Sequence, residues 1–196
     1  MEAVLSICLG IGLAAACGFR IFVPFLVMSV ASRTEHLTLG GSFDWISTDA
    51  AMVTFAVASA LEIGAYFVPW LDNLLDSMST PVAVVAGTLA AAAAIQDTSP
   101  LVTWTLAAIG GGGAAGIIQT GMSLIRGASS LLTGGLGNPV ISAAEAGTSI
   151  SLAGIAVTVP LLGVALAATV MLYLAVRTGR RLAGEREAVP VADRSS

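Results

Sequence analysis

The sequence predicts an all-α fold, a polytopic bundle of about five transmembrane helices, and three observations lead to it. Hydrophobic residues make up 56% of the chain and charged residues only 10%, whereas a soluble domain carries about 25% charged residues. Several apolar runs are long enough to cross a hydrocarbon core of about 30 Å. These runs are continuous and rich in Ala, Leu and Gly, which favours helices over the alternating strands of a membrane barrel.

The first membrane element, Ala3 to Ala31, is interrupted by Cys17-Gly18-Phe19-Arg20 and, shortly afterwards, by Pro24. Glycine permits unusual backbone conformations and proline suits the first turn of a helix, so we expect a broken or re-entrant half-helix here. An arginine within a membrane usually faces a cavity, a carboxylate or a lipid headgroup, which makes Arg20 a candidate binding residue. The alternative is that its long side chain reaches an interface.

The second span, Ala50 to Trp70, carries Glu62 and leads into a polar stripe. The stripe consists of Glu62, Tyr66, Pro69, Asn73 and Asp76, at spacings of four, three, four and three. These spacings place its members on one face of a helix, with a kink at Pro69. We expect Glu62, Tyr66 and Asn73 to bind a substrate or ion. The alternative is a stripe that packs against neighbouring helices.

The connection after this span is acidic. Asp72 and Asp76 are four residues apart, so both carboxylates can lie on one helix face. We expect them to form an acidic mouth on the outer side of the membrane, where they would attract a cation. The alternative is a solvated acidic surface.

A fourth span, Leu101 to about Ile125, follows a short third span from Pro81 to Ile95. The fourth span contains the run Gly110 to Gly116, whose small residues have the spacing that lets helix backbones approach closely. We expect this run to serve helix packing, with a local break as a variant. Gly- and Ala-rich faces of this kind also suit a homo-oligomer or a membrane partner.

The last apolar region begins at Asn138-Pro139, a strong helix start because Asn caps free N–H groups and Pro fits the first turn. The apolar sequence then runs from Val140 to Val176, which is longer than one span needs. We therefore expect a half-helix that begins inside the membrane at Asn138, a break near Gly147 or Pro160, and then a full span. The N-terminus of such a half-helix suits an anion or a polar group. The alternative is one long, kinked helix.

Glu145 lies two turns into that region, in a segment that resembles part of the second span. Ser59 to Gly64 and Ser142 to Gly147 share a serine, a glutamate and a glycine at the same spacing. Transporters often contain internal repeats, so both Glu62 and Glu145 are candidate ligands for a substrate or ion. The alternative is a chance match in an Ala-rich chain.

Residues 1–176 form one predicted transmembrane domain, and residues 177–196 form a polar tail that we expect to be disordered. Three basic residues, Arg177, Arg180 and Arg181, follow the last span directly. Because cytoplasmic loops carry an excess of basic residues, we expect a multi-pass protein of the cell membrane with a cytoplasmic C-terminus. Counting back through the predicted spans places Arg33 inside and the acidic segment outside.

Five motifs occur along the chain outside the tail. They are ACGFR with a following FVP (Ala16 to Pro24), EIGAYFVPWLDNLLD (Glu62 to Asp76), TPVAVVAGT (Thr80 to Thr88), GGGGAAG (Gly110 to Gly116) and TGGLGNP (Thr133 to Pro139). Together they resemble the bacterial integral membrane family called domain of unknown function 4126. The resemblance implies a small integral membrane protein and brings no activity and no catalytic residue with it.

These patterns favour a transporter or channel-like permease for an ion or a small polar or anionic solute. Its intramembrane residues would be Arg20, Glu62, Asn138 and Glu145. One alternative is an accessory or structural subunit, in which the same charges pair with one another. Another is a lipid-handling protein, in which Arg20 meets a phosphate headgroup.

An enzyme is the least favoured class. The sequence contains no Ser/His, metal-ligand or paired-acid pattern, and its single histidine, His36, falls in a loop. No cofactor is predicted and no metal is assigned. The lack of a basic patch excludes nucleic acid as a partner, and the lipid bilayer is the expected environment.

Overall fold

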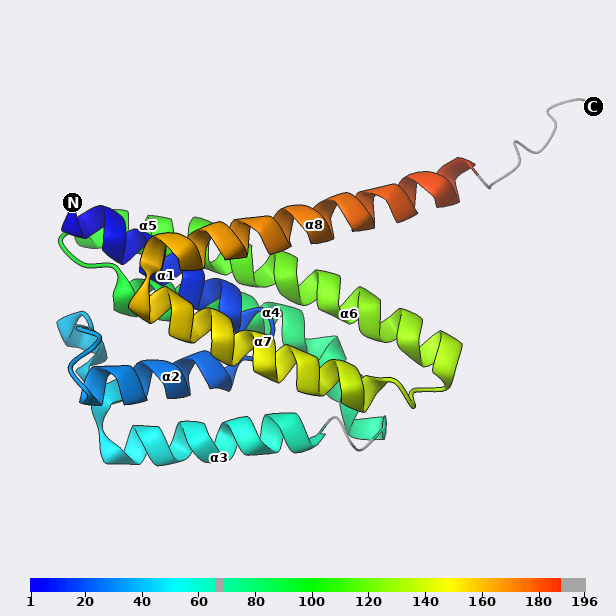
Figure 1. Ribbon diagram of the computed structural model, residues 1–196, viewed down its shortest axis with the longest axis horizontal. Helices are drawn as coiled ribbons and strands as arrows, with labels where there is room; N and C mark the ends of the chain where they lie inside the picture. The colour runs from blue at the N-terminus through cyan, green and yellow to red at the C-terminus, as the bar shows by residue number, and fades with distance from the viewer. Residues whose placement is uncertain (66–68, 188–196) are drawn as a thin grey trace, which may run out of the picture.

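A computed structural model describes the backbone of residues 1–65 and 69–187 and the side chains of residues 1–65, 78–177 and 179. Within these ranges every regular element is a helix, which confirms the all-α prediction (Figure 1). In chain order the elements are α1 (Glu2–Cys17), α2 (Phe22–Arg33), η1 (Gly41–Ser47), α3 (Asp49–Ala65), α4 (Pro69–Ala94), α5 (Pro100–Leu106), η2 (Ala107–Gly112), α6 (Gly113–Thr133), α7 (Asn138–Thr158) and α8 (Pro160–Glu187).

Three described segments are long and apolar enough to cross a membrane: Pro100–Thr133, Asn138–Thr158 and Pro160–Arg177. The first runs through α5, the π-helical turn η2 and α6. A fourth candidate is the pair η1 and α3, which is bent by 67°. The 26 residues of α4 correspond to about 39 Å of helix, so α4 is also long enough to cross the membrane. The predicted number of about five spans approximates this arrangement.

The outward faces of these helices are apolar. Leu61 on α3, Ile109 on η2 and Leu172 on α8 are 68%, 75% and 66% exposed. Large exposed apolar surfaces on long helices are the expected surface of a protein that lipid surrounds. The protein is therefore a multi-pass membrane protein.

The first membrane element is a re-entrant hairpin. With 16 and 12 residues, α1 and α2 are about 24 and 18 Å long, too short for the hydrocarbon core. The start of α1 and the loop after α2 meet at Gln96, because Ser6 donates a hydrogen bond to the Gln96 carbonyl and the Gln96 amide donates to the Thr38 carbonyl. The chain therefore enters and leaves on the same side, which confirms the predicted break near Arg20 (Figure 1).

The helices that follow run from one end of the molecule to the other (Figure 1). The N-terminus, the loop 34–48, the turn 95–99 and the α7–α8 break at Val159 lie at one end, which we call the N-terminal end. The α6–α7 turn, the start of α4 and the C-terminal half of α8 lie at the opposite end.

A helix begins at Asn138 as predicted, but it is a full-length helix and not a half-helix. Helix α7 is an uninterrupted helix of 21 residues, and Gly147 lies inside it without a break. The predicted break near Pro160 is present: the chain turns at Val159, because Pro160 has no N–H with which to continue the α7 ladder and starts α8. The backbone of α8 is helical to Glu187, so the segment predicted as a tail begins within this helix.

Because α7 is a full-length helix, the segments that share one side of the membrane differ from those predicted. The start of α4, which carries Asp72 and Asp76, lies at the same end as the C-terminal half of α8 (Figure 1). The count of spans from the sequence placed the acidic segment and the C-terminus on opposite sides, because it treated α7 as a half-helix and so contained one crossing fewer.

Small residues let α1, α4 and η2 pack backbone to backbone. A Cβ atom on Gly111 would lie 2.5 Å from the Ala91 Cβ and 2.8 Å from the Gly87 carbonyl oxygen. A Cβ on Gly87 would lie 2.5 Å from the Ala115 Cβ. The Gly110–Gly116 run therefore serves packing between helices of this chain, as its spacing predicts.

Candidate functional site

The tip of the hairpin, residues 18–21, is the place where a membrane helix is broken. Gly18 approaches α6 so closely that a Cβ atom would lie 2.7 Å from the Ala115 carbonyl oxygen. At the end of α1 the Ala15 and Ala16 carbonyls accept from the N–H groups of Gly18 and Phe19, whereas the N–H groups at the start of α2 have no helical partners. Inside a bilayer such groups need partners from the protein itself.

Side chains of two other helices supply partners on both sides of the break. Ser149 on α7 donates a hydrogen bond to the Ala16 carbonyl at 3.0 Å. The Glu62 carboxylate on α3 accepts from the N–H groups of Ile21 at 2.7 Å and Phe22 at 3.1 Å. Glu62 therefore caps the N-terminus of α2 with a negative charge, where the helix dipole favours one.

A third helix contributes Gln119. With its amide oriented to suit its neighbours, Gln119 donates to the Gly18 carbonyl at 2.9 Å. Its oxygen then accepts from the Ser79 hydroxyl at 2.8 Å and from an Arg126 N–H at 3.1 Å. Gln119 therefore links the Gly18 carbonyl at the break to Ser79 on α4 and to Arg126 on its own helix, α6.

Three charged residues at the tip, Arg20, Arg126 and Glu145, are fully buried. Arg20 is 1% exposed, donates to the Ser142 carbonyl and hydroxyl at 3.0 and 2.6 Å, and pairs with the Glu145 carboxylate at 2.9 Å. The other oxygen of Glu145 lies 3.3 Å from the Arg126 guanidinium. One carboxylate therefore bridges two guanidinium groups, and Arg20 does not reach an interface.

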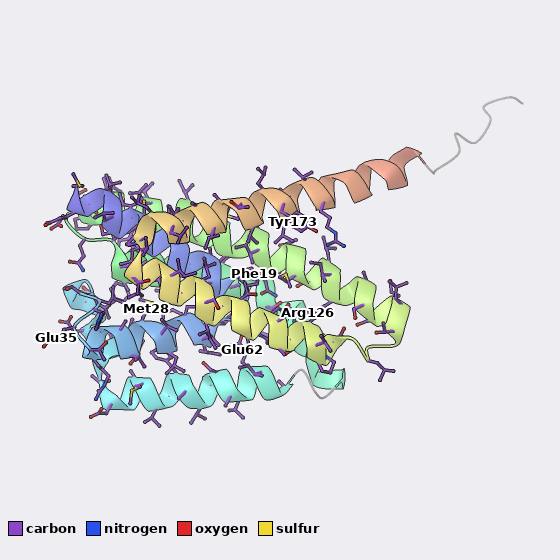
Figure 2. All side chains as sticks on the ribbon, in the orientation of Figure 1. Phe19, Met28, Glu35, Glu62, Arg126 and Tyr173 are labelled. Atoms are coloured by element: carbon purple, nitrogen blue, oxygen red, sulfur yellow. The ribbon has the colours of Figure 1, made fainter. Side chains whose placement is uncertain are left out.

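We call Arg20, Glu62, Arg126 and Glu145 the tip cluster. It contains two positive and two negative groups. Burial of an unpaired charge costs several kcal/mol, on the order of 3 kcal/mol even by membrane-insertion scales. Figure 2 shows Glu62 and Arg126 well away from Glu35, which lies at the N-terminal end. The tip cluster therefore holds balanced charges deep within the bundle.

Helix α7 brings one polar face to the hairpin. Asn138, Ser142, Glu145 and Ser149 follow one another at spacings of four, three and four and are all buried. Ser142 and Glu145 contact Arg20, while Asn138 donates to Ser130 at 2.9 Å and so joins the first turn of α7 to α6. Asn138 thus belongs to the same face, two turns from Glu145.

Part of the predicted site lies outside the described residues. Tyr66 is not described, and neither are the side chains of Asp72, Asn73 and Asp76. Glu62 is therefore the member of the predicted stripe whose contacts are known. It is half-buried, whereas Glu145 is 1% exposed.

Sequence reasoning missed Arg126 and Gln119. Arg126 begins a Gly- and Ser-rich stretch that resembles a loop, but α6 continues through it to Thr133. The available signal was their spacing of seven residues, two helical turns, which places both side chains on one face of α6. Among the described residues, no group of three or more His, Cys, Asp and Glu side chains could hold a metal ion.

The helices and the tip cluster define the class of the protein: a polytopic α-helical membrane protein with a charged site at a re-entrant hairpin. Within that class, the chain belongs to the family described as Domain of unknown function (DUF4126), whose model matches residues 7–181. The matched range contains the whole tip cluster. No curated protein and no solved structure matches the chain significantly.

Proposed function

We propose that this protein is a transporter or channel-like permease that moves an ion or a small anionic solute through the tip cluster. The observation that carries the proposal is the Glu145 carboxylate, which bridges Arg20 and Arg126 at the tip of a re-entrant hairpin. Ionisable residues inside a membrane are costly and usually functional. Breaks in membrane helices commonly form the substrate sites of transporters.

The two glutamates have different surroundings, which assigns them different roles in the proposal. Glu145 contacts two guanidinium groups, whereas the hydrogen bonds of the half-buried Glu62 come from two backbone N–H groups. Protonation of Glu62 would weaken its hold on the start of α2. An anionic solute could then take its place beside Arg20, so that a proton and an anion move together and the charge stays balanced.

A structural or accessory role is the second candidate. It is favoured by the complete burial of Arg20 and Glu145 and by their direct pairing. In that case the tip cluster would fix the hairpin, and a Gly- or Ala-rich face would pack against a partner or a second copy.

The distribution of arginine indicates an orientation in the cell membrane. Five of the eight basic residues lie at or beyond the end of the last membrane span, namely Arg177, Arg180, Arg181, Arg186 and Arg194. We propose that the C-terminus is cytoplasmic, because basic residues concentrate on that side. The acidic start of α4 is then also cytoplasmic, and the N-terminus and the loop 34–48 face outward.

Proton and anion flux in liposomes that contain the purified protein test the proposal. We expect wild-type protein to conduct, and Glu62→Gln to lose most of the flux while remaining folded, because Gln cannot take up and release a proton. Glu35→Gln is the matched control, since Glu35 is an exposed loop carboxylate. Equal flux in Glu62→Gln and wild type, or no flux of any tested ion, would overturn the transport proposal.

A further inference from the structure

A lateral groove of about 590 Å³ lies between α2, α3 and α7 and opens to the side of the bundle. Most of its lining is apolar. The apolar lining includes Val23, Val27 and Val30 on α2, Ile63 on α3, and Ile150 and Val157 on α7. Because these helices lie in the membrane, the open side of the groove faces lipid.

The groove has a polar end and an apolar end. Thr34, His36 and Thr158 line it where α2 and α7 end, at the N-terminal end of the molecule. Val23 and Ile63 line it at the other end, next in sequence to the Phe22–Glu62 contact. The groove therefore runs from a membrane surface towards the tip cluster and becomes apolar with depth.

Nothing within the described chain fills this space. Gly154 lines the groove, and a Cβ atom there would meet nothing within 4 Å. Ser59 also lines the groove.

We propose that this groove binds one acyl chain of a phospholipid from the leaflet at the N-terminal end. The phosphate headgroup lies at the polar end of the groove, beside Thr34, His36 and Thr158. The chain extends from there towards Val23 and Ile63. The order of polarity along the groove is that of a lipid in its leaflet, polar at the surface and apolar towards the midplane. This lipid site does not depend on the proposed transport function.

The test is photo-crosslinking in vesicles of phosphatidylethanolamine and phosphatidylglycerol that contain a phospholipid with a diazirine near the end of one acyl chain. Mass spectrometry of the labelled protein should find the label concentrated on Val23, Ile63 and Ile150. Gly154→Leu fills the groove and should lower that labelling by about tenfold. Gly147→Leu is the matched control, because Gly147 lies on the same helix, is exposed and does not line the groove.

Three results would overturn the lipid site. The first is labelling of the outward residues Leu61 and Leu172 as strong as labelling of the groove. The second is unchanged labelling in Gly154→Leu, or in Ser59→Leu if Gly154→Leu does not fold. The third is preferential labelling by a free fatty acid with the same diazirine, which would show that the occupant is not a phospholipid. Labelling that persists in Glu62→Gln without flux would separate the lipid site from the transport proposal.

Discussion

Glu145 is the residue on which the tip cluster depends. Its carboxylate contacts Arg20 at 2.9 Å and Arg126 at 3.3 Å, and all three residues are 1% exposed. Loss of one partner of a buried ion pair is costly because it leaves the other charge buried without compensation. Here one substitution removes the carboxylate that both guanidinium groups contact and leaves the tip cluster with two positive groups and one negative group.

We therefore expect Glu145→Gln to destabilise the protein by about 3–5 kcal/mol. Thermal unfolding in detergent measures this loss, with Glu35→Gln as a control that replaces an exposed carboxylate by the same amide. A melting temperature of Glu145→Gln equal to that of the control would show that the bridge contributes nothing to stability.

At this scale the sequence identified Arg20, Glu62 and Glu145, because each is a charge within an apolar run. It could not pair them. The Arg20–Glu145 contact joins residues 125 positions apart, and only the folded arrangement of α2, α6 and α7 brings Arg126 to the same carboxylate.

The elements are positioned by glycine contacts and by breaks at proline. The sequence predicted close helix packing at Gly110–Gly116, and η2 packs against α4 through this run. It did not predict that α7 is complete, because a helix start at Asn138-Pro139 looks the same in sequence whether it lies at a membrane surface or inside the membrane. The depth of the helix start in the membrane depends on how α7 packs against neighbouring helices.

Two glycines that are two residues apart, Gly111 in η2 and Gly113 at the start of α6, provide a test of the packing. Gly111→Ala places a Cβ atom 2.5 Å from the Ala91 Cβ, and we expect it to cost about 1–3 kcal/mol of stability. Gly113→Ala meets nothing within 4 Å, and should be neutral or stabilise the helix by up to about 1 kcal/mol. Thermal unfolding of the two variants side by side decides the point, and equal melting temperatures would contradict the close approach of η2 and α4.

For the whole molecule, the re-entrant hairpin fixes which segments share a side. The N-terminus and the loop 34–48 lie at one end, and the α6–α7 turn lies at the other. We expect cysteines at Glu2 and Ser42 to react with a membrane-impermeant maleimide from the same side, in a protein whose Cys8 and Cys17 are replaced by serine. A cysteine at Leu136 should react from the opposite side. Labelling of Glu2→Cys and Ser42→Cys from opposite sides would mean that the first element crosses the membrane once.

The arrangement of the whole bundle places the four charges of the tip cluster where a proton and an anion can be exchanged together. The most direct measurement is proton movement driven by an imposed anion gradient in proteoliposomes held at zero membrane potential. We predict that protons follow the anion into the vesicles with wild-type protein and with Glu35→Gln, and do not move with Glu62→Gln. Anion flux without proton movement would contradict the role of Glu62, and the absence of both fluxes would leave the tip cluster as a structural feature of the hairpin.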